Sequence, residues 1–246
     1  MLSIHEATRH FGGLTAVSKV TFDVAEGEIM GVIGPNGAGK TTFFNLVSGA
    51  IPLSSGSITF DGRSIGGLPP HRVAHLGIGR TFQIVRPFGE LSVLDNVLAG
   101  MGAVPCRSLP GALRLCKRQK HLDKARAILA STRLLAVENE VARNLPLGLL
   151  RRLEIARALA LQPKLLLLDE SFSGLSHKET ESLSELVLEL RTGGMTVLLI
   201  EHNMHITMNL CDRLVVLDRG HKIAEGTPDA IRLNEAVVSA YLGTED

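Results

Sequence analysis

The chain has 246 residues, of which 45% are hydrophobic and 21% charged, and its formal net charge is +1. This length is enough for one large domain with a buried core, and the composition is that of an ordinary globular protein. A charge so close to zero argues against nucleic acid as a partner, and no apolar run reaches the roughly 20 residues that a membrane-spanning helix needs.

The first third of the sequence predicts short strands separated by turns. Residues 20–24 alternate between apolar and polar side chains, as in a strand with one buried face. Residues 29–33 are a continuous apolar run, which is typical of a strand buried on both faces. A further hairpin is predicted at residues 57–60, where the turn dipeptide Asp61-Gly62 follows.

A glycine-rich loop follows the apolar run at residues 29–33. It matches the phosphate-loop pattern G-x-x-x-x-G-K-[ST] and leads into a helical run that begins with Thr42. Its residues are Gly34, Pro35, Asn36, Gly37, Ala38, Gly39, Lys40 and Thr41. Glycines let backbone N–H groups surround a polyphosphate, and a helix N-terminus adds favourable partial charge. We therefore expect this loop and Thr42 to bind a nucleotide, with Lys40 at the terminal phosphates and the Thr41 hydroxyl on Mg²⁺.

From about residue 91 the pattern becomes helical and then returns to alternating strands and helices. Helices are predicted at residues 113–135, 149–161 and 178–191, and strands at residues 165–168, 195–200 and 214–217. Such alternation indicates an α/β fold with a parallel sheet covered by helices. Residues 91–160 would then be a helical insertion within a single domain that spans residues 1–246.

Two acidic residues end the leucine-rich strand predicted at residues 165–168. We expect Asp169 to hold Mg²⁺, directly or through water, as phosphoryl-transfer enzymes require. Glu170 is expected to be the general base that orients and deprotonates the attacking water. A strand ending in two acids is often only a solvated edge, but its occurrence together with a phosphate loop favours a catalytic site.

With these two motifs the chain resembles the ATP-binding subunits of ABC transporters over nearly its whole length. The resemblance implies a P-loop NTPase fold with a mostly parallel core sheet, an N-terminal antiparallel β subdomain and an inserted helical subdomain. It implies ATP and Mg²⁺ as cofactors. It also implies that Phe11 stacks on adenine, that Gln83 contacts magnesium, the attacking water and the transmembrane partner, and that His202 contacts the γ-phosphate.

Several stretches resemble more narrowly the branched-chain amino acid importer group, namely residues 11–17, 79–83, 151–157, 225–228 and 240–243. We interpret them as signs of kinship that carry less chemistry. They imply an importer for branched-chain or related amino acids, with transmembrane permeases, a second ATP-binding subunit and, indirectly, a solute-binding protein as partners. The implied location is peripheral, on the cytoplasmic face of the inner membrane.

The chain departs from this family at the signature loop, Leu-Ser-Gly-Gly-Gln. The corresponding residues are Leu145, Pro146, Leu147, Gly148 and Leu149. In the family this loop donates hydrogen bonds to the γ-phosphate held by the other subunit, and proline offers neither a hydroxyl nor an N–H group. Two smaller departures are Ser171, where proline is usual, and Ser176, where aspartate is usual.

The intact motifs and the altered loop together predict an asymmetric pair of ATPases. Lys40, Asp169, Glu170 and His202 would hydrolyse ATP once a partner supplies a better signature loop, whereas the site completed by residues 145–149 would mainly hold ATP. A heterodimer is expected, and a homodimer stays open. So does an ATP-dependent dimerisation module with weak turnover. A third class, a soluble ABC ATPase acting on DNA or ribosomes, is disfavoured because the chain has neither a second cassette nor a long coiled-coil insertion.

Overall fold

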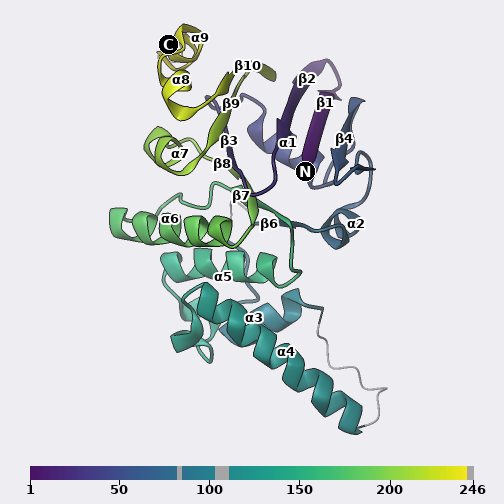
Figure 1. Cartoon of the computed structure of the whole chain (residues 1–246), viewed down its shortest axis with the longest axis vertical. Coiled ribbons are helices and arrows are strands. Elements are labelled where there is room, and N and C mark those ends of the chain that lie inside the picture. Colours follow the sequence, from purple (N-terminus) through teal and green to yellow (C-terminus); the bar gives the residue numbers. More distant parts are fainter. Residues whose placement is uncertain (82–84, 103–110, 243–246) are drawn as a thin grey trace.

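The computed structural model describes residues 1–81, 85–102 and 111–242 of the chain. Two β-sheets occupy one end of the molecule and a group of helices the other (Figure 1). The first sheet is antiparallel, with the order β2-β1-β4-β5, and its strands are β1 (Leu2–Phe11), β2 (Leu14–Val24), β4 (Ser55–Phe60) and β5 (Arg63–Ser64).

The second sheet has the order β10-β9-β3-β8-β7-β6, and all neighbours are parallel except β10 and β9. Its strands are β3 (Ile29–Ile33), β6 (Ile78–Arg80), β7 (Leu165–Asp169), β8 (Thr196–Ile200), β9 (Arg213–Asp218) and β10 (His221–Gly226). This mostly parallel sheet beside an antiparallel N-terminal sheet confirms the predicted fold class.

Along the chain, the described helices lie between strands or after the last strand, β10. They are α1 (Lys40–Val47), α2 (Pro70–His75), α3 (Val93–Gly100), α4 (Gly111–Ser131), α5 (Leu147–Leu159), α6 (His177–Thr192), α7 (Met204–Leu210), α8 (Pro228–Arg232) and α9 (Glu235–Leu242), with short 3₁₀ turns at Leu135–Val137 and Ala142–Asn144. No helix in the described part of the chain is long and apolar enough to cross a membrane.

The mixed sheet separates two apolar cores, and β7 shows why its sequence is uniformly apolar. Leu165 and Leu167 pack into the core on the side of the antiparallel sheet and α1, whereas Leu166 and Leu168 pack into the core on the side of α6 and α7. All four side chains are fully buried. Because successive side chains of a strand point to opposite faces, a strand covered on both faces needs an unbroken apolar run.

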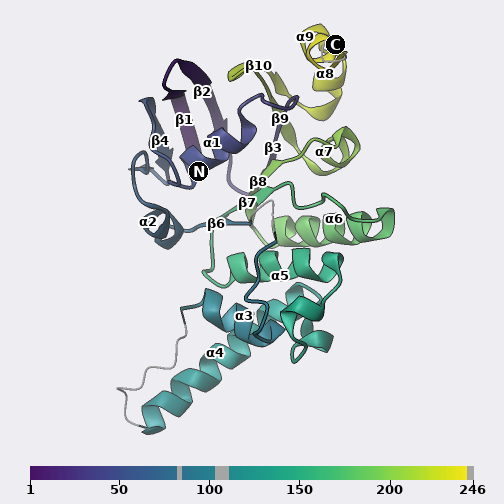
Figure 2. The same ribbon diagram turned by 180° about the vertical axis from the view of Figure 1, so that it is seen from behind.

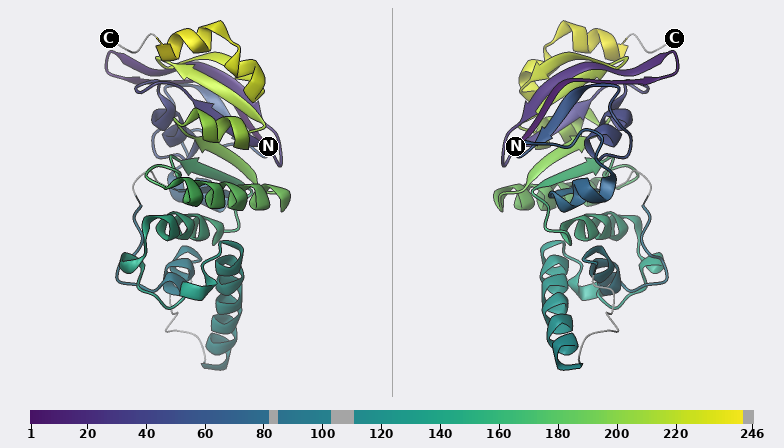
Figure 3. Two further views of the ribbon diagram at one scale, coloured as in Figure 1. Left: turned by 90° about the vertical axis from the view of Figure 1, so that its left-hand side faces the viewer. Right: turned by 90° about the vertical axis from the view of Figure 1, so that its right-hand side faces the viewer.

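Helices α3, α4 and α5 lie beyond the β6 edge of the mixed sheet and form a core of their own, to which Val93, Leu129 and Leu153 contribute (Figure 2). Side views place α4 and the C-terminal helices α8 and α9 at opposite ends of the molecule (Figure 3). The chain enters the helical group after β6 and leaves it into β7. The helical group therefore connects the end of β6 to the start of the neighbouring parallel strand β7.

Two predicted helices differ from the observed ones at their ends. The helix predicted at residues 113–135 ends at Ser131, because Arg133 adopts a left-handed backbone with φ of 59°. The helix predicted at residues 149–161 runs instead from Leu147 to Leu159. It begins early because Pro146, with an extended backbone, occupies the position just before the first helical residue.

Candidate nucleotide-binding site

The predicted phosphate loop is the turn between β3 and α1, and its path requires glycine. Gly34, Gly37 and Gly39 have φ of 151°, 78° and 98°. A Cβ atom on Gly34 would lie 2.0 Å from the carbonyl oxygen of Leu217, and one on Gly39 would lie 2.3 Å from that of Ala16. Gly37 has open space around it and needs glycine only for its backbone angle.

Lys40 is the first residue of α1, and its side chain folds back over the loop. Its Nζ donates to the carbonyl oxygens of Gly34 at 2.6 Å and Pro35 at 3.0 Å. Burial lowers the pKa of Lys40, and the negative charge of Glu170 acts in the opposite direction. Lys40 and Glu170, from two motifs far apart in the sequence, thus lie within electrostatic reach of each other.

The start of α1 is suited to an anion. No acidic residue lies in its first turn, and Gly39 before it provides no side-chain cap, so the first N–H groups of the helix have no side-chain acceptor. These N–H groups, the positive end of the helix dipole and the ammonium of Lys40 converge on the same loop. The loop therefore fits a polyphosphate, which would supply acceptors and a counter-charge.

Asp169 is the last residue of β7 and is only 2% exposed. Its Oδ2 accepts a hydrogen bond from Nη2 of Arg80 at 2.9 Å, whereas the buried Oδ1 has no hydrogen-bond partner among the described residues. Burial raises the pKa of Asp169 and the ion pair with Arg80 opposes this rise. A buried carboxylate oxygen without a donor is what a hard cation such as Mg²⁺ would bind, so the site fits the metal.

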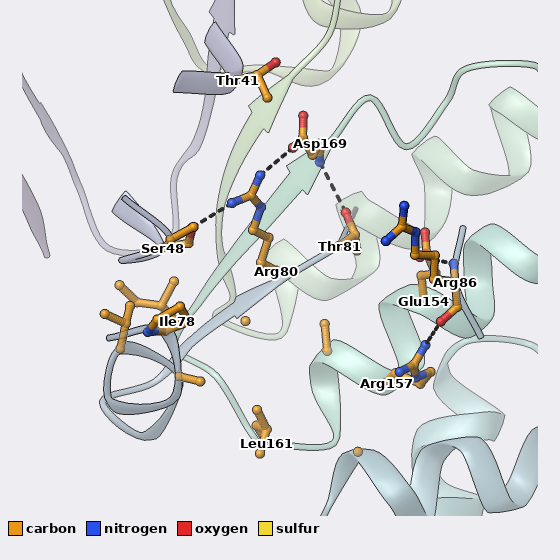
Figure 4. Close-up of a pocket in the computed structure, with 17 residues that line it drawn as sticks. Thr41, Ser48, Ile78, Arg80, Thr81, Arg86, Glu154, Arg157, Leu161 and Asp169 are labelled. Atoms are coloured by element: carbon orange, nitrogen blue, oxygen red, sulfur yellow. Dashed lines mark hydrogen bonds and ion pairs between the residues drawn. The ribbon is translucent and has the colours of Figure 1, made fainter. Parts of the chain in front are cut away.

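A cavity of about 660 Å³ opens beside these groups. Its lining includes Thr41, Arg80, Thr81 and Asp169, together with Glu154 of α5. In Figure 4 the carboxylate of Asp169 points toward Thr41, the other predicted magnesium ligand. The structure thus brings the ends of β6, β7 and the phosphate loop to one place.

Glu170 follows β7 directly and turns the chain with a positive φ of 47°. Its N–H group donates to the carbonyl oxygen of Ile200, the last residue of β8, at 3.0 Å. A left-handed backbone is uncommon for a residue other than glycine. Glu170 is half-buried and lies within electrostatic reach of Lys40 and Asp169, and its role as base stays a prediction.

His202 lies just beyond β8, and its side chain is exposed. Because Ile200 pairs with Asp169 across the sheet, His202 lies at the same sheet edge as the two acids. The neighbouring Glu201 is buried, and its Oε1 accepts a hydrogen bond from the N–H of Phe172 at 3.0 Å. Burial raises the pKa of Glu201 to about 7. Sequence reasoning missed this buried acid beneath the site.

Two further residues carry predicted roles. Phe11 ends β1 and is 44% exposed, and the guanidinium of Arg9 lies over its ring at 4.6 Å from the centroid. Its stacking on adenine stays a prediction. Gln83 lies outside the described residues, so its roles at the metal and the transmembrane partner also stay predictions.

The altered signature loop opens α5, with Pro146 immediately before its first residue and no side-chain cap. Gly148 lies against Glu179 of α6, because a Cβ atom on Gly148 would lie 2.6 Å from Glu179 Oε1. The other oxygen of Glu179, Oε2, accepts the N–H of Ser176 at 2.9 Å, and the Ser176 hydroxyl caps α6 in return. Ser176 thus replaces the usual aspartate as a helix cap.

Ser171 and Arg80 carry contacts that sequence reasoning missed. Ser171 is buried, and its Oγ lies 3.0 Å from Oγ1 of Thr81, a hydrogen bond that proline could not make. Arg80, interpreted above only as a sign of kinship, contacts Asp169 directly. The available signal was a basic residue inside the short strand-forming stretch just before Gln83.

The C-terminal helix α9 lies beside the phosphate loop. Its small residues Ala236, Ser239 and Ala240 line a cleft of about 360 Å³, and residues 35–38 form the opposite wall. Burial raises the pKa of Tyr241 to about 12, and an interaction with the backbone of Gly34 opposes the rise. The last described turn of the chain therefore lies close to the first glycine of the loop.

Comparison with known proteins agrees with this geometry. A family model described as ABC transporter matches residues 17–173, and one described as branched-chain amino acid ATP-binding cassette transporter matches residues 221–246. The chain is 42% identical over 250 residues to the high-affinity branched-chain amino acid transport ATP-binding protein LivG of Salmonella typhimurium, covering 99% of this chain and 98% of the relative. It is 41% identical over 256 residues to the protein BraF of Pseudomonas aeruginosa, which carries the same description, with the same coverage.

The fold also matches a solved structure. The crystal structure of the ADP conformation of an ATP-binding cassette of an ABC transporter aligns with a TM-score of 0.87 and 31% identity, covering 99% of this chain and 98% of that one. The resemblance inferred from the motifs is therefore confirmed. The chain belongs to the ABC transporter family of ATP-binding proteins, and it carries the C-terminal segment of that family's branched-chain amino acid group.

Proposed function

We infer that this chain, an ATP-hydrolysing member of the ABC transporter family, energises an importer for branched-chain or related amino acids. The observation that carries the ATPase is that Thr41 of the phosphate-loop motif and Asp169 at the end of β7 line one cavity, with Lys40 and Glu170 within electrostatic reach of each other. The C-terminal segment at residues 221–246 and the descriptions of LivG and BraF support the substrate class.

Each residue of the site would have its own role in ATP hydrolysis. The loop N–H groups and Lys40 would hold the phosphates of ATP, and Thr41 and Asp169 would hold Mg²⁺, which neutralises phosphate charge when bound. Glu170 would take the proton of the attacking water, and its half-buried position beside Lys40 keeps it near the phosphates. His202, at the same sheet edge, would contact the γ-phosphate.

The partners follow from the family and from the altered signature loop. We propose that the whole of residues 1–246 forms one ATP-binding domain that docks on transmembrane permeases at the cytoplasmic face of the membrane, where a solute-binding protein delivers the amino acid from the other side. The second ATP-binding subunit is proposed to be a different chain, because Pro146 cannot donate a hydrogen bond to a partner's nucleotide.

The test of catalysis uses purified protein combined with its partner ATPase and permeases. Glu170→Gln should bind Mg·ATP as the parent does and lose about 10²–10⁴-fold in turnover, because it removes only the base. Lys40→Ala should lose the nucleotide affinity itself. Glu181→Gln, at a position 64% exposed on α6, is the matched control. Wild-type turnover in Glu170→Gln would contradict the assignment.

A transport assay distinguishes an ATPase whose own hydrolysis drives uptake from the alternative, a dimerisation module with weak turnover. In vesicles carrying the complete transporter, uptake of labelled leucine should stop in Glu170→Gln if hydrolysis by this chain drives transport, and should continue in the alternative. Trapping nucleotide at each composite site and counting turnovers tests the asymmetry. Equal hydrolysis at both sites would refute the heterodimer model.

A further inference from the structure

Arg80 occupies a position from which it contacts both elements that carry the proposed magnesium ligands. It is the last residue of β6, and its side chain is 12% exposed. Nη2 donates to Asp169 Oδ2 at 2.9 Å, at the end of β7. Nη1 donates to Asn45 Oδ1 at 2.8 Å and to Ser48 Oγ at 2.6 Å, at the C-terminal end of α1. Figure 4 shows the guanidinium between Ser48 and Asp169.

The same guanidinium determines which oxygen of Asp169 is left for a metal. Oδ2 is bonded to Arg80, and Oδ1, equally buried, has no hydrogen-bond partner among the described residues. Thr41, the other proposed ligand, belongs to α1, and it lines the same cavity as Arg80 and Asp169. The two ligands therefore come from different elements, and Arg80 bonds to both of these elements.

The backbone of Asp169 is held by the residue after Arg80. The N–H of Asp169 donates to Thr81 Oγ1 at 3.2 Å, and the N–H of Thr81 donates to the carbonyl oxygen of Leu167 at 2.9 Å. Residues 80 and 81 thus fix both the main chain and the carboxylate of Asp169. An ion pair that served stability alone would not need to leave the second, buried oxygen of Asp169 without a hydrogen-bond partner among the described residues.

We propose that Arg80 is a positioning residue of the magnesium site, which ties Asp169 to α1 and presents Asp169 Oδ1 toward Thr41. The inference rests on the proposed function of Asp169 and Thr41 as metal ligands. Arginine suits this role because its planar guanidinium has several donors in fixed directions, whereas a lysine ammonium is a point charge that cannot reproduce the bridge. Groups that orient metal ligands are typically worth about 10–100-fold in metal affinity.

The test measures nucleotide affinity of the purified full-length chain with a fluorescent ATP analogue, once with excess Mg²⁺ and once with EDTA. In Arg80→Lys and Arg80→Met, the tightening of binding by Mg²⁺ should fall by about 10–100-fold, while affinity in EDTA stays at the parent value. The double variant Asn45→Ala/Ser48→Ala, which removes only the α1 side of the bridge, should lose less. Arg213→Lys, which alters the ion pair with Glu28 at the opposite end of the parallel strands, is the matched control.

The outcomes are distinguishable. If Arg80→Lys keeps the parent's magnesium dependence, or loses affinity equally with and without Mg²⁺, the positioning role is refuted. Asp169→Asn reports on the metal site itself. If that variant also keeps the parent's magnesium dependence, the proposed ligand role of Asp169 fails. If Asp169→Asn loses it and the Arg80 variants do not, only the Arg80 inference fails. Thermal unfolding of each variant identifies a folding defect, and the Lys variant decides if the Met variant does not fold.

Discussion

The buried carboxyl group of Glu201 should make the free energy of unfolding of this protein depend on pH. The carboxyl group is 1% exposed, and burial raises its pKa from 4.5 to about 7. Because the folded state holds the proton more tightly than the unfolded chain, wild-type stability falls as pH rises through the window from 4.5 to 7. One pKa unit corresponds to about 1.36 kcal/mol, so the full loss is about 3 kcal/mol.

The perturbation is Glu201→Gln, which keeps an oxygen for the N–H of Phe172 and cannot ionise. The free energy of unfolding of the variant should match that of wild type at pH 4.5 and exceed it by up to about 3 kcal/mol at pH 8. Urea unfolding at a series of pH values measures this difference. Glu154, whose pKa burial also raises to about 7, titrates in both proteins and cancels in the difference. Glu181→Gln is the exposed control. A difference between Glu201→Gln and wild type that stays constant with pH would refute the linkage.

Three further substitutions have defined outcomes. Gly39→Ala should abolish nucleotide binding and lower the melting temperature, since the new Cβ meets the carbonyl of Ala16; retained ATP affinity in a binding assay would contradict this. Pro146→Ser should stabilise α5 by about 1 kcal/mol through a new N-cap and raise turnover at the site that this loop completes, measured by unfolding and by ATPase assay with the partner. Ser171→Ala should cost about 1 kcal/mol in urea unfolding by removing the hydrogen bond to Thr81, and unchanged stability would show that this contact contributes nothing.

The parts of the site that could be predicted are those whose chemistry is local in sequence. The glycine-rich loop at residues 34–41 and the strand buried on both faces at residues 29–33 were both predictable, and the loop glycines with positive φ and the packing of that strand into both cores agree with this. Spacing within a motif was enough for these because each depends on the backbone of a few consecutive residues.

The parts that could not be predicted depend on contacts between distant segments. Arg80 and Asp169 are 89 residues apart, and nothing in either stretch alone indicates that they meet. Helix α4 ends at Ser131, before the helical sequence pattern ends, because Arg133 adopts a left-handed backbone. Strand β6 has only three residues, too few to show the alternation of side chains that identifies a strand in a sequence. Tertiary pairing overrides local preference at such places.

The position of α9 has a practical consequence for anyone handling this protein. Tyr241 lies near the backbone of Gly34, and small residues of α9 line a cleft together with residues 35–38 of the phosphate loop. A substitution that displaces α9 would therefore also change the lining of the cleft beside the phosphate loop. An assay of ATP affinity is therefore interpreted most directly in a protein whose α9 is unaltered.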